Sequence, residues 1–262
     1  MFIDTHTHVT WGIDDGLQSL EDCQMALSMY KEQGVKSLIA TPHFIPGTND
    51  VKLRGIIQRM QDVQVLAKSY GIEYYPGCEF MLNDMYASMF LSKRYFTLAN
   101  SQYLLVEFDV RKPLGDYDSV EERLYACFQN SLIPVIAHVE RYFPGGLDLE
   151  RVKEWLDMGC FLQVNRTSIL GMHGKTIQKN AFTLLDQGLV HLVATDMHRV
   201  TGNRIPSFLD VYEVLMKRVG EKNAQLLTYY NPKRIIENRS FEWMVPVPKK
   251  KRFFFNKLGM YL

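Results

Sequence analysis

The chain has 262 residues with 30 basic and 29 acidic side chains, and its formal net charge of +1 at pH 7 gives no reason to expect nucleic-acid binding. Its 47% hydrophobic and 23% charged residues are typical of a globular protein, and no apolar run reaches the roughly 18 residues that a membrane span needs. The N-terminus shows no signal-peptide pattern, and the widely spaced Cys23, Cys78, Cys127 and Cys160 indicate reduced, buried thiols, so we expect a cytoplasmic protein.

The chain opens with a short predicted strand that runs into His6-Thr7-His8 and then into a loop with Asp15 before a glycine. Because residues i and i+2 of a strand point to the same face, His6 and His8 present two imidazoles together. Asp15 adds an oxygen ligand from the adjoining loop, so the segment predicts a divalent-metal site. By itself, the same pattern also fits a solvated strand.

A helix followed by a buried strand then recurs along the chain. Ser19 predicts the start of the first helix, with Asp22 three residues on, and Gly34 predicts its end. A short helix is expected over residues 81–90, and a long helix over 208–237 should break near Asn231-Pro232. After the opening strand, we predict strands at 35–40, 72–79, 103–107, 133–138, 161–165 and 190–198.

This alternation predicts an α/β fold with a parallel sheet. Seven strands without a glycine-rich dinucleotide fingerprint favour a distorted (β/α)7 TIM-like barrel in a single domain, with a doubly wound open sheet as the alternative. We assign residues 1–240 to the barrel. Residues 241–262 form a basic, aromatic tail that either lies on a membrane surface or partner, or is disordered or packed on its own barrel.

Side chains able to bind metals stand at the carboxyl end of almost every predicted strand. In a parallel barrel these ends all face one mouth, so residues distant in sequence meet there. His173 and His191 lie elsewhere and are interpreted as structural or loop residues. The predicted ligands are His6, His8, Asp15, His43, Glu79, Glu107, His138, Asp196 and His198.

This set is too large for one tetrahedral zinc and suits two or three bridged ions of manganese, iron or zinc. Such a cluster activates water near neutral pH and clamps the oxygens of a phosphate ester, which favours phosphate ester hydrolysis. Arg141 and Arg204 follow two of the histidines, and a guanidinium matches phosphate oxygens bidentately. Either arginine could instead pair with an acidic neighbour such as Glu140.

The motifs resemble those of the PHP (polymerase and histidinol phosphatase) superfamily, and more narrowly the bacterial manganese-dependent protein tyrosine phosphatases of capsule and exopolysaccharide operons. The resemblance covers residues 1–238, and residues 135–142 are its most specific part. The matching segments are Asp4-Thr5-His6-Thr7-His8, Asp14-Asp15-Gly16, Thr41-Pro42-His43, Gly77-Cys78-Glu79, Val106-Glu107-Phe108, Ala137-His138-Val139-Glu140-Arg141-Tyr142 and Ala194-Thr195-Asp196-Met197-His198.

The resemblance implies a centre of three metal ions on a distorted seven-stranded barrel. It also implies that Arg141 and Arg204 contact phosphate, although Arg204 lies one residue further from His198 than in the family pattern, which makes Arg199 a rival. The implied ligand sets are His6, His8, Glu79 and Asp196 for one ion; Glu79, Glu107 and His138 for the second; and Asp15, His43 and His198 for the third.

The family's substrate is a phosphotyrosine cluster on the tail of a membrane-bound tyrosine autokinase that controls polysaccharide synthesis. The resemblance therefore implies metal-assisted hydrolysis of phosphotyrosine, with no cysteine nucleophile. A small-molecule phosphatase of the histidinol-phosphatase type, a metal-dependent amidohydrolase and a non-catalytic metal-binding adaptor remain as alternatives.

Overall fold

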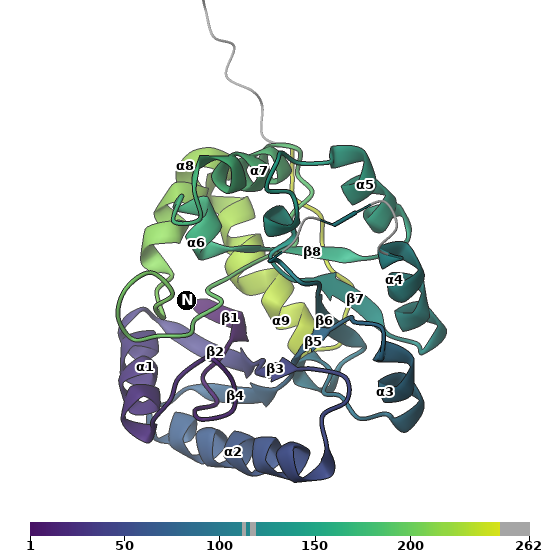
Figure 1. The fold of residues 1–262 in the computed structure, drawn as a ribbon. Coiled ribbons are helices and arrows are strands. Elements are labelled where there is room, and N and C mark those ends of the chain that lie inside the picture. The colour runs from purple at the N-terminus through teal and green to yellow at the C-terminus, as the bar shows by residue number, and fades with distance from the viewer. Residues whose placement is uncertain (112–113, 116–118, 247–262) are drawn as a thin grey trace, which may run out of the picture.

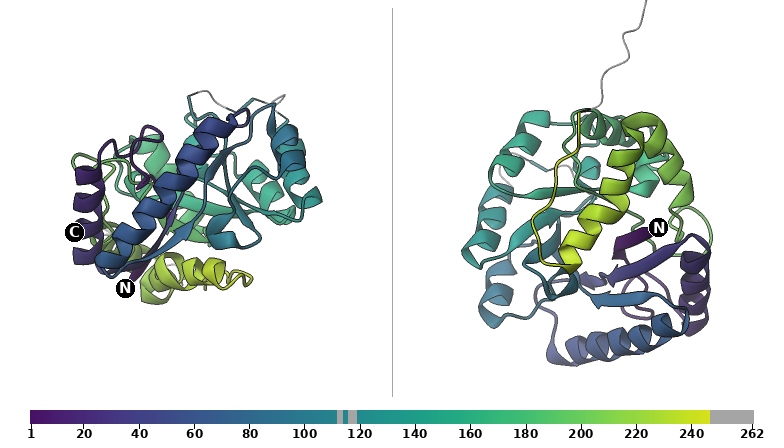
Figure 2. Two further views of the ribbon diagram at one scale, coloured as in Figure 1. Left: turned by 90° about the horizontal axis from the view of Figure 1, so that it is seen from below. Right: turned by 180° about the vertical axis from the view of Figure 1, so that it is seen from behind.

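The computed structural model describes residues 1–111, 114–115 and 119–246 (Figure 1). The strands form a curled parallel array with helices around its outside (Figures 1 and 2). One sheet has the order β1-β2-β4, formed by β1 (Phe2–Thr7), β2 (Val35–Ala40) and β4 (Glu73–Pro76). The second sheet runs in the order β3 (His43–Phe44), β5 (Glu79–Met81), β6 (Tyr103–Glu107), β7 (Ile133–Ile136), β8 (Phe161–Asn165), β9 (Leu192–Ala194).

Every described strand pairing is parallel, so the carboxyl ends of the strands lie at one edge of the array. A single bridge between Thr7 and Met197 brings β1 beside the segment that follows β9. The first and last strands of the chain therefore meet at the same edge, which places His6 and His8 near Asp196 and His198.

The α/β fold and parallel sheet predicted from the sequence are confirmed, but the strand count differs. The described residues contain nine strands rather than seven, because the predicted strand 72–79 is divided into β4 and β5, and a further short strand, β3, follows β2. The break between β2 and β3 falls at Pro42, which has no N–H to donate to a ladder. The break between β4 and β5 falls at Gly77, where a Cβ atom would lie 2.9 Å from the side chain of Ile39.

Helices cover the outside of the array. Ser19 caps the first helix as predicted, since its side chain accepts a hydrogen bond from the backbone N–H of Asp22 at 3.1 Å. The described helices are α1 (Leu20–Glu32), α2 (Asp50–Ser69), α3 (Tyr86–Ser92), α4 (Val120–Gln129), α5 (Leu149–Asp157), α6 (Arg166–Ile169), α7 (Lys175–Asp186), α8 (Leu209–Gln225) and α9 (Asn231–Ile236), with short 3-10 turns η1 (Leu98–Asn100) and η2 (Val139–Tyr142) and a π-helical turn η3 (Leu226–Tyr230).

Two helix predictions need correction. The short helix α3 begins at Tyr86 rather than at residue 81, because Met81 still belongs to β5 and pairs with Glu107. The long C-terminal helix departs from helical backbone angles at Gly220, whose φ is +80°, which the sequence does not predict; near the predicted interruption, the π-helical turn η3 gives way to α9 at Asn231. Pro232 lies in the first turn of α9, where a missing N–H leaves no hydrogen bond unmade.

The far side of the array, away from the strand ends that carry the predicted site, is closed by the C-terminal elements. η3 contacts β1 and β9, and α9 contacts β1; the right panel of Figure 2, seen from behind, shows the C-terminal helices lying across this side of the strands. The ring of Phe241 then stacks on Tyr103, with ring centroids 4.6 Å apart, and contacts Phe161 edge-on at 4.5 Å.

The four cysteines are free and buried, as predicted. No helix among the described residues is long and apolar enough to cross a membrane. The basic cluster of the predicted tail, residues 249–252, lies outside the described residues.

Candidate metal centre

The carboxylate of Glu79, at the start of β5, is the hub of the site. Its Oε2 atom lies 3.2 Å from Nε2 of His6, 3.2 Å from Nε2 of His8 and 3.0 Å from Nδ1 of His43. Its Oε1 atom lies 2.8 Å from Nε2 of His138. Four imidazoles from β1, its following loop, β3 and the end of β7 therefore converge on one side chain, which is itself buried.

Asp196 gathers the ligands on the other flank. Its Oδ1 atom lies 3.4 Å from Nε2 of His6, 3.6 Å from Nε2 of His8 and 3.4 Å from Nδ1 of His198. Asp15 completes this flank from the loop after β1, with Oδ1 3.2 Å from Nε2 of His43 and 3.3 Å from Nε2 of His198.

The convergent atoms form three groups that could each hold an ion. In each group the ligand atoms lie within 4.8 Å of one another. One group contains the predicted set of Asp15, His43 and His198 with His8 added. The other two are His6, His8 and Asp196, and His43, Glu79 and Glu107.

The groups differ from the implied sets in three respects. His8 joins Asp15, His43 and His198; Glu79 is not grouped with His6, His8 and Asp196; and His43 takes the place of His138 beside Glu79 and Glu107. His138 lies outside that last group although its Nε2 atom is 2.8 Å from Glu79 and 3.9 Å from Glu107. All the side chains predicted as ligands nevertheless stand at one edge of the array.

The geometry of several buried atoms fits cations better than it fits hydrogen bonds. Glu79 Oε2 and His43 Nδ1 approach to 3.0 Å, yet neither atom has a partner in hydrogen-bonding geometry. The same holds for Glu107 Oε1 and His198 Nε2. Buried polar atoms are almost always hydrogen-bonded. Buried nitrogen and oxygen atoms that lie close together without hydrogen bonds are therefore candidates to bind a cation between them.

The family model for capsular polysaccharide synthesis, CpsB/CapC, matches residues 2–237. This chain belongs to the CpsB/CapC family. It is 31% identical over 247 residues to the tyrosine-protein phosphatase CpsB of Streptococcus pneumoniae, covering 89% of this chain and 98% of the relative. The resemblance found in the sequence motifs is thereby confirmed.

Solved structures support the same fold. A crystal structure from work on YwqE of Bacillus subtilis and CpsB of Streptococcus pneumoniae, metal-dependent tyrosine phosphatases, matches with a TM-score of 0.76 and 24% identity, covering 93% of this chain and 97% of the other. The lactonase Lmo2620 of Listeria monocytogenes matches with a TM-score of 0.60 and 13% identity, covering 92% and 95%. The architecture of this CpsB/CapC family member is thus shared with hydrolases of different chemistry.

Buried hydrogen bonds orient the candidate ligands. Asp14 Oδ2 lies 2.8 Å from Nδ1 of His8, so Nδ1 carries the proton and Nε2 keeps its lone pair. Gln163 Oε1, on β8, lies 3.0 Å from Nδ1 of His6 and accepts from the backbone N–H of His138 at 3.0 Å. Asn165 donates from Nδ2 to Asp196 Oδ2 at 2.6 Å.

Sequence reasoning missed the roles of Asp14 and Gln163. Asp14 is next to the predicted ligand Asp15, and Gln163 stands two residues before Asn165 on the same face of its strand. Both signals were present, but neither residue type is specific for supporting a metal ligand.

Two candidate ligands lie in the left-handed region of the backbone. His138 has φ 34° and Asp196 has φ 50°, and each lies two residues after the end of a strand, β7 and β9 respectively. Non-glycine residues in this conformation cost about 1–3 kcal/mol each and are concentrated at functional sites. These turns direct both side chains toward the candidate metal centre, instead of continuing the alternating side-chain directions of the strand.

Burial and neighbouring charges shift the pKa values of the carboxylates and imidazoles at the centre. Burial alone would raise the pKa of Glu79, but the imidazoles of His6 and His43 hold it well below its usual range. Burial would lower the pKa of His6, yet the charges of Glu79 and Asp196 raise it to about 9. Burial, with the charge of Glu79, raises the pKa of Glu107 to about 7. Protons thus neutralise charges that cations would neutralise, and ion binding must displace them.

Two of the three arginines considered for phosphate binding face the centre. Arg204 donates from Nη2 to Asp196 Oδ1 at 2.6 Å, and Nη1 of Arg141 lies 3.7 Å from Asp196 Oδ2. Their side chains are 28% and 21% exposed, so each guanidinium can be reached from solvent. Arg199 instead points to the carbonyl oxygens of the loop around Asp15.

His173, interpreted from the sequence as a loop residue, lies near this arginine pair. Burial, and then the positive charges of Arg141 and Arg204, lower its pKa to about 4. Its Nε2 atom lies 2.9 Å from the hydroxyl of Thr167. His191, by contrast, is buried against Phe161 and Trp243 away from the site, as a structural residue should be.

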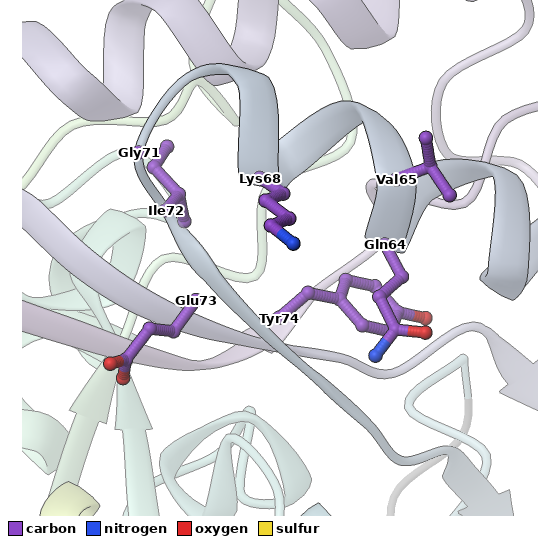
Figure 3. A pocket seen from close by; sticks show the side chains of 7 residues that line it. All are labelled: Gln64, Val65, Lys68, Gly71, Ile72, Glu73 and Tyr74. Carbon is purple, nitrogen blue, oxygen red and sulfur yellow. The ribbon is translucent and has the colours of Figure 1, made fainter.

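A surface depression between α2 and β4 is separate from this centre (Figure 3). It lies at the amino-terminal end of β4, which begins at Glu73, whereas the candidate ligands follow the carboxyl ends of strands. It contains none of the predicted site residues; its lining is Gln64, Val65, Lys68, Gly71, Ile72, Glu73 and Tyr74.

Proposed function

We propose that this chain is a metal-dependent protein tyrosine phosphatase that hydrolyses phosphotyrosine on a bacterial tyrosine autokinase and so regulates capsule or exopolysaccharide synthesis. The observation that carries the proposal is the convergence of three ion-sized ligand groups on Glu79 and Asp196. Relatives in the CpsB/CapC family, such as the tyrosine-protein phosphatase CpsB of Streptococcus pneumoniae, support the substrate class.

We infer that two or three divalent ions occupy the centre, with Mn²⁺ the expected metal and iron or zinc as alternatives. The mixed nitrogen and oxygen donors suit these borderline cations. His6, His8, Glu79 and Asp196 would hold one ion, and Asp15, His43 and His198 another. Glu79 would bridge to the ion held by Glu107 and His138. Such ions activate water at neutral pH and neutralise phosphate oxygens.

The chain's own groups then account for substrate binding. Arg141 and Arg204 are assigned to the phosphate, because each is always charged, partly exposed and within 3.7 Å of the buried Asp196. Guanidinium groups fixed in place before reaction stabilise the charge that develops on the phosphoryl oxygens. The phenol of tyrosine has a pKa of about 10, so it leaves more readily than an alkoxide and needs little help from a general acid.

None of the cysteines is suited to act as a nucleophile. All four are buried, and burial raises the pKa of Cys23, Cys78 and Cys127 to about 12, so none offers a thiolate at neutral pH.

We read the fold as a distorted (β/α)7 TIM-like barrel spanning residues 1–240, because β2 and β3, like β4 and β5, are consecutive segments that together occupy one strand position each. We place the protein in the cytoplasm, where the tail of a membrane kinase would be accessible. Residues 241–246 pack on the barrel, and the basic segment after them, residues 249–252, would provide peripheral contact with that membrane or kinase.

The test is a phosphatase assay on the purified full chain loaded with Mn²⁺. We expect turnover of a phosphotyrosine peptide well above that of an alkyl phosphate, and complete loss with a chelator that is reversed by Mn²⁺. The matched variants are His43→Ala, which should abolish turnover, and the exposed Lys217→Ala, which should not change it. Preference for the alkyl phosphate would indicate a small-molecule phosphatase, and inactivity on every phosphate would indicate an adaptor or an amidohydrolase.

A further inference from the structure

The loop that carries Asp15 holds the most exposed of the candidate ligands. The side chain of Asp15 is 62% exposed, whereas those of Asp196 and His198 are 1% and 2% exposed. Asp15 lies in an irregular loop, where no strand pairing fixes its backbone. A ligand in such a loop loses conformational entropy when an ion orders it, unless other contacts hold it beforehand.

Arg199 makes contacts of this kind. Its Nη1 atom donates to the carbonyl oxygen of Asp15, to that of Gly16 at 2.9 Å, and to that of its neighbour His198 at 2.8 Å. One guanidinium therefore joins the loop after β1 to the segment after β9. The ligand atoms on the two joined segments, Asp15 Oδ1 and His198 Nε2, lie 3.3 Å apart.

The same contacts explain why Arg199 does not face the predicted phosphate position. Its Nη1 group donates to backbone carbonyls, while Arg204 bonds to Asp196 at the centre. Through Nη1, Arg199 links the backbone of the segment that carries Asp15 to that of His198.

We propose that Arg199 is a positioning residue for the ion site formed by Asp15, His43 and His198. It holds the Asp15 loop at the distance from His198 that a shared ion requires. The inference rests on the proposed metal centre but not on the identity of the substrate, because it concerns binding of the ion and not turnover.

The direction in which Mn²⁺ affinity changes when Arg199 is replaced distinguishes a positioning role from a purely electrostatic one. A guanidinium near a cation site repels the cation, so loss of its charge alone should strengthen ion binding. Loss of a group that orients a metal ligand should weaken ion binding, by about 10–100-fold. The two roles of Arg199 thus predict opposite results for the same substitution.

The experiment is calorimetric titration of the metal-free full chain with Mn²⁺, with metal content measured after gel filtration. For Arg199→Ala we expect the weakest-bound ion to bind about 10–100-fold less tightly, and one fewer ion per chain to survive filtration. Arg199→Lys keeps the charge with a single donor group and should lie between Arg199→Ala and the wild type.

The matched control is Arg234→Ala. Arg234 also donates to a backbone carbonyl, that of Ser240 at 3.1 Å, but on α9 at the far side of the array. We expect its metal content to equal that of the wild type. Unchanged or tighter Mn²⁺ binding by Arg199→Ala, or equal losses in both alanine variants, would overturn the proposal. A wild-type chain that binds the ions yet ignores phosphotyrosine would refute the proposed function alone.

Discussion

The carboxylate of Asp14 determines which ring nitrogen of His8 is free to bind an ion, and Asp14→Asn tests this role. Asp14 accepts from the backbone N–H of His43 at 2.9 Å and from that of Gly16 at 2.8 Å, and it lies 2.8 Å from Nδ1 of His8. Asparagine has one acceptor oxygen and one NH₂ group, which can only donate. The N–H of Gly16 bonds to Oδ1, whereas the N–H of His43 and Nδ1 of His8 share Oδ2. With the asparagine oxygen retained at the N–H of Gly16, the NH₂ group takes the position of Oδ2, faces His8 and favours the tautomer with its proton on Nε2.

That tautomer blocks the atom that points to the centre, since Nε2 of His8 lies 3.2 Å from Glu79 Oε2. In this orientation the variant loses the charge-assisted hydrogen bond to His8, worth about 1.5–3 kcal/mol, and also the bond from the N–H of His43. Since 1.4 kcal/mol is tenfold in an equilibrium constant, we expect Mn²⁺ affinity and kcat/KM to fall by about 10–100-fold.

The assay is Mn²⁺ titration of the metal-free protein followed by turnover of a phosphotyrosine peptide at saturating Mn²⁺. Asp148→Asn is the control, because Asp148 caps α5 by accepting from the N–H of Arg151 and asparagine caps helices equally well. If Asp14→Asn binds Mn²⁺ and turns over substrate within about threefold of the wild type, the tautomer argument is wrong, since a lost hydrogen bond of that kind costs more.

Further outcomes follow from packing, thiol chemistry and burial. Gly16→Ala should lower Mn²⁺ affinity, because the added Cβ would lie 2.5 Å from the Cβ of His8, whereas Gly55→Ala, with open space around it, should leave titration unchanged; equal titrations would contradict this. Replacement of all four cysteines by serine should leave turnover per folded molecule intact, and cysteine-dependent activity would refute the metal mechanism. Burial lowers the pKa of His191 to about 3, so below about pH 6.5 the unfolded chain binds a proton that the folded chain does not, and stability falls as pH falls toward 3. Between pH 7 and pH 5 His191 contributes about 2 kcal/mol to this loss, so the loss of unfolding free energy measured in urea should be smaller by about that amount in His191→Leu.

The candidate ligands at the strand ends could be predicted because each is marked by the residues next to it in the sequence. Each predicted ligand follows an apolar run or a short motif such as His6-Thr7-His8, and parallel topology alone then brings them to one edge. The same reasoning predicts Arg141 and Arg204 near the ligands. Which of Arg199 and Arg204 lies beside Asp196 depends on where the loop between residues 199 and 204 turns, and the sequence does not give this because both arginines are equally charged and lie close together.

The remaining features depend on contacts between segments distant in sequence. Gln163 supports His6 from a strand 157 positions away, and no pattern around Gln163 predicts that pairing. The breaks in the strands at Pro42 and Gly77 depend on how closely neighbouring strands pack, and Gly77 lies against Ile39 from β2. The departure at Gly220 similarly reflects a left-handed backbone angle that a helical periodicity cannot reveal.

The position of Glu79 has a consequence for how the centre fills. One oxygen atom lies within 3.2 Å of imidazoles that belong to different ion groups, so an ion captured by one group sets the orientation and charge of the carboxylate for the next. Successive ions should therefore bind with coupled affinities, so that a substitution at one ion site also changes how tightly the other ions bind.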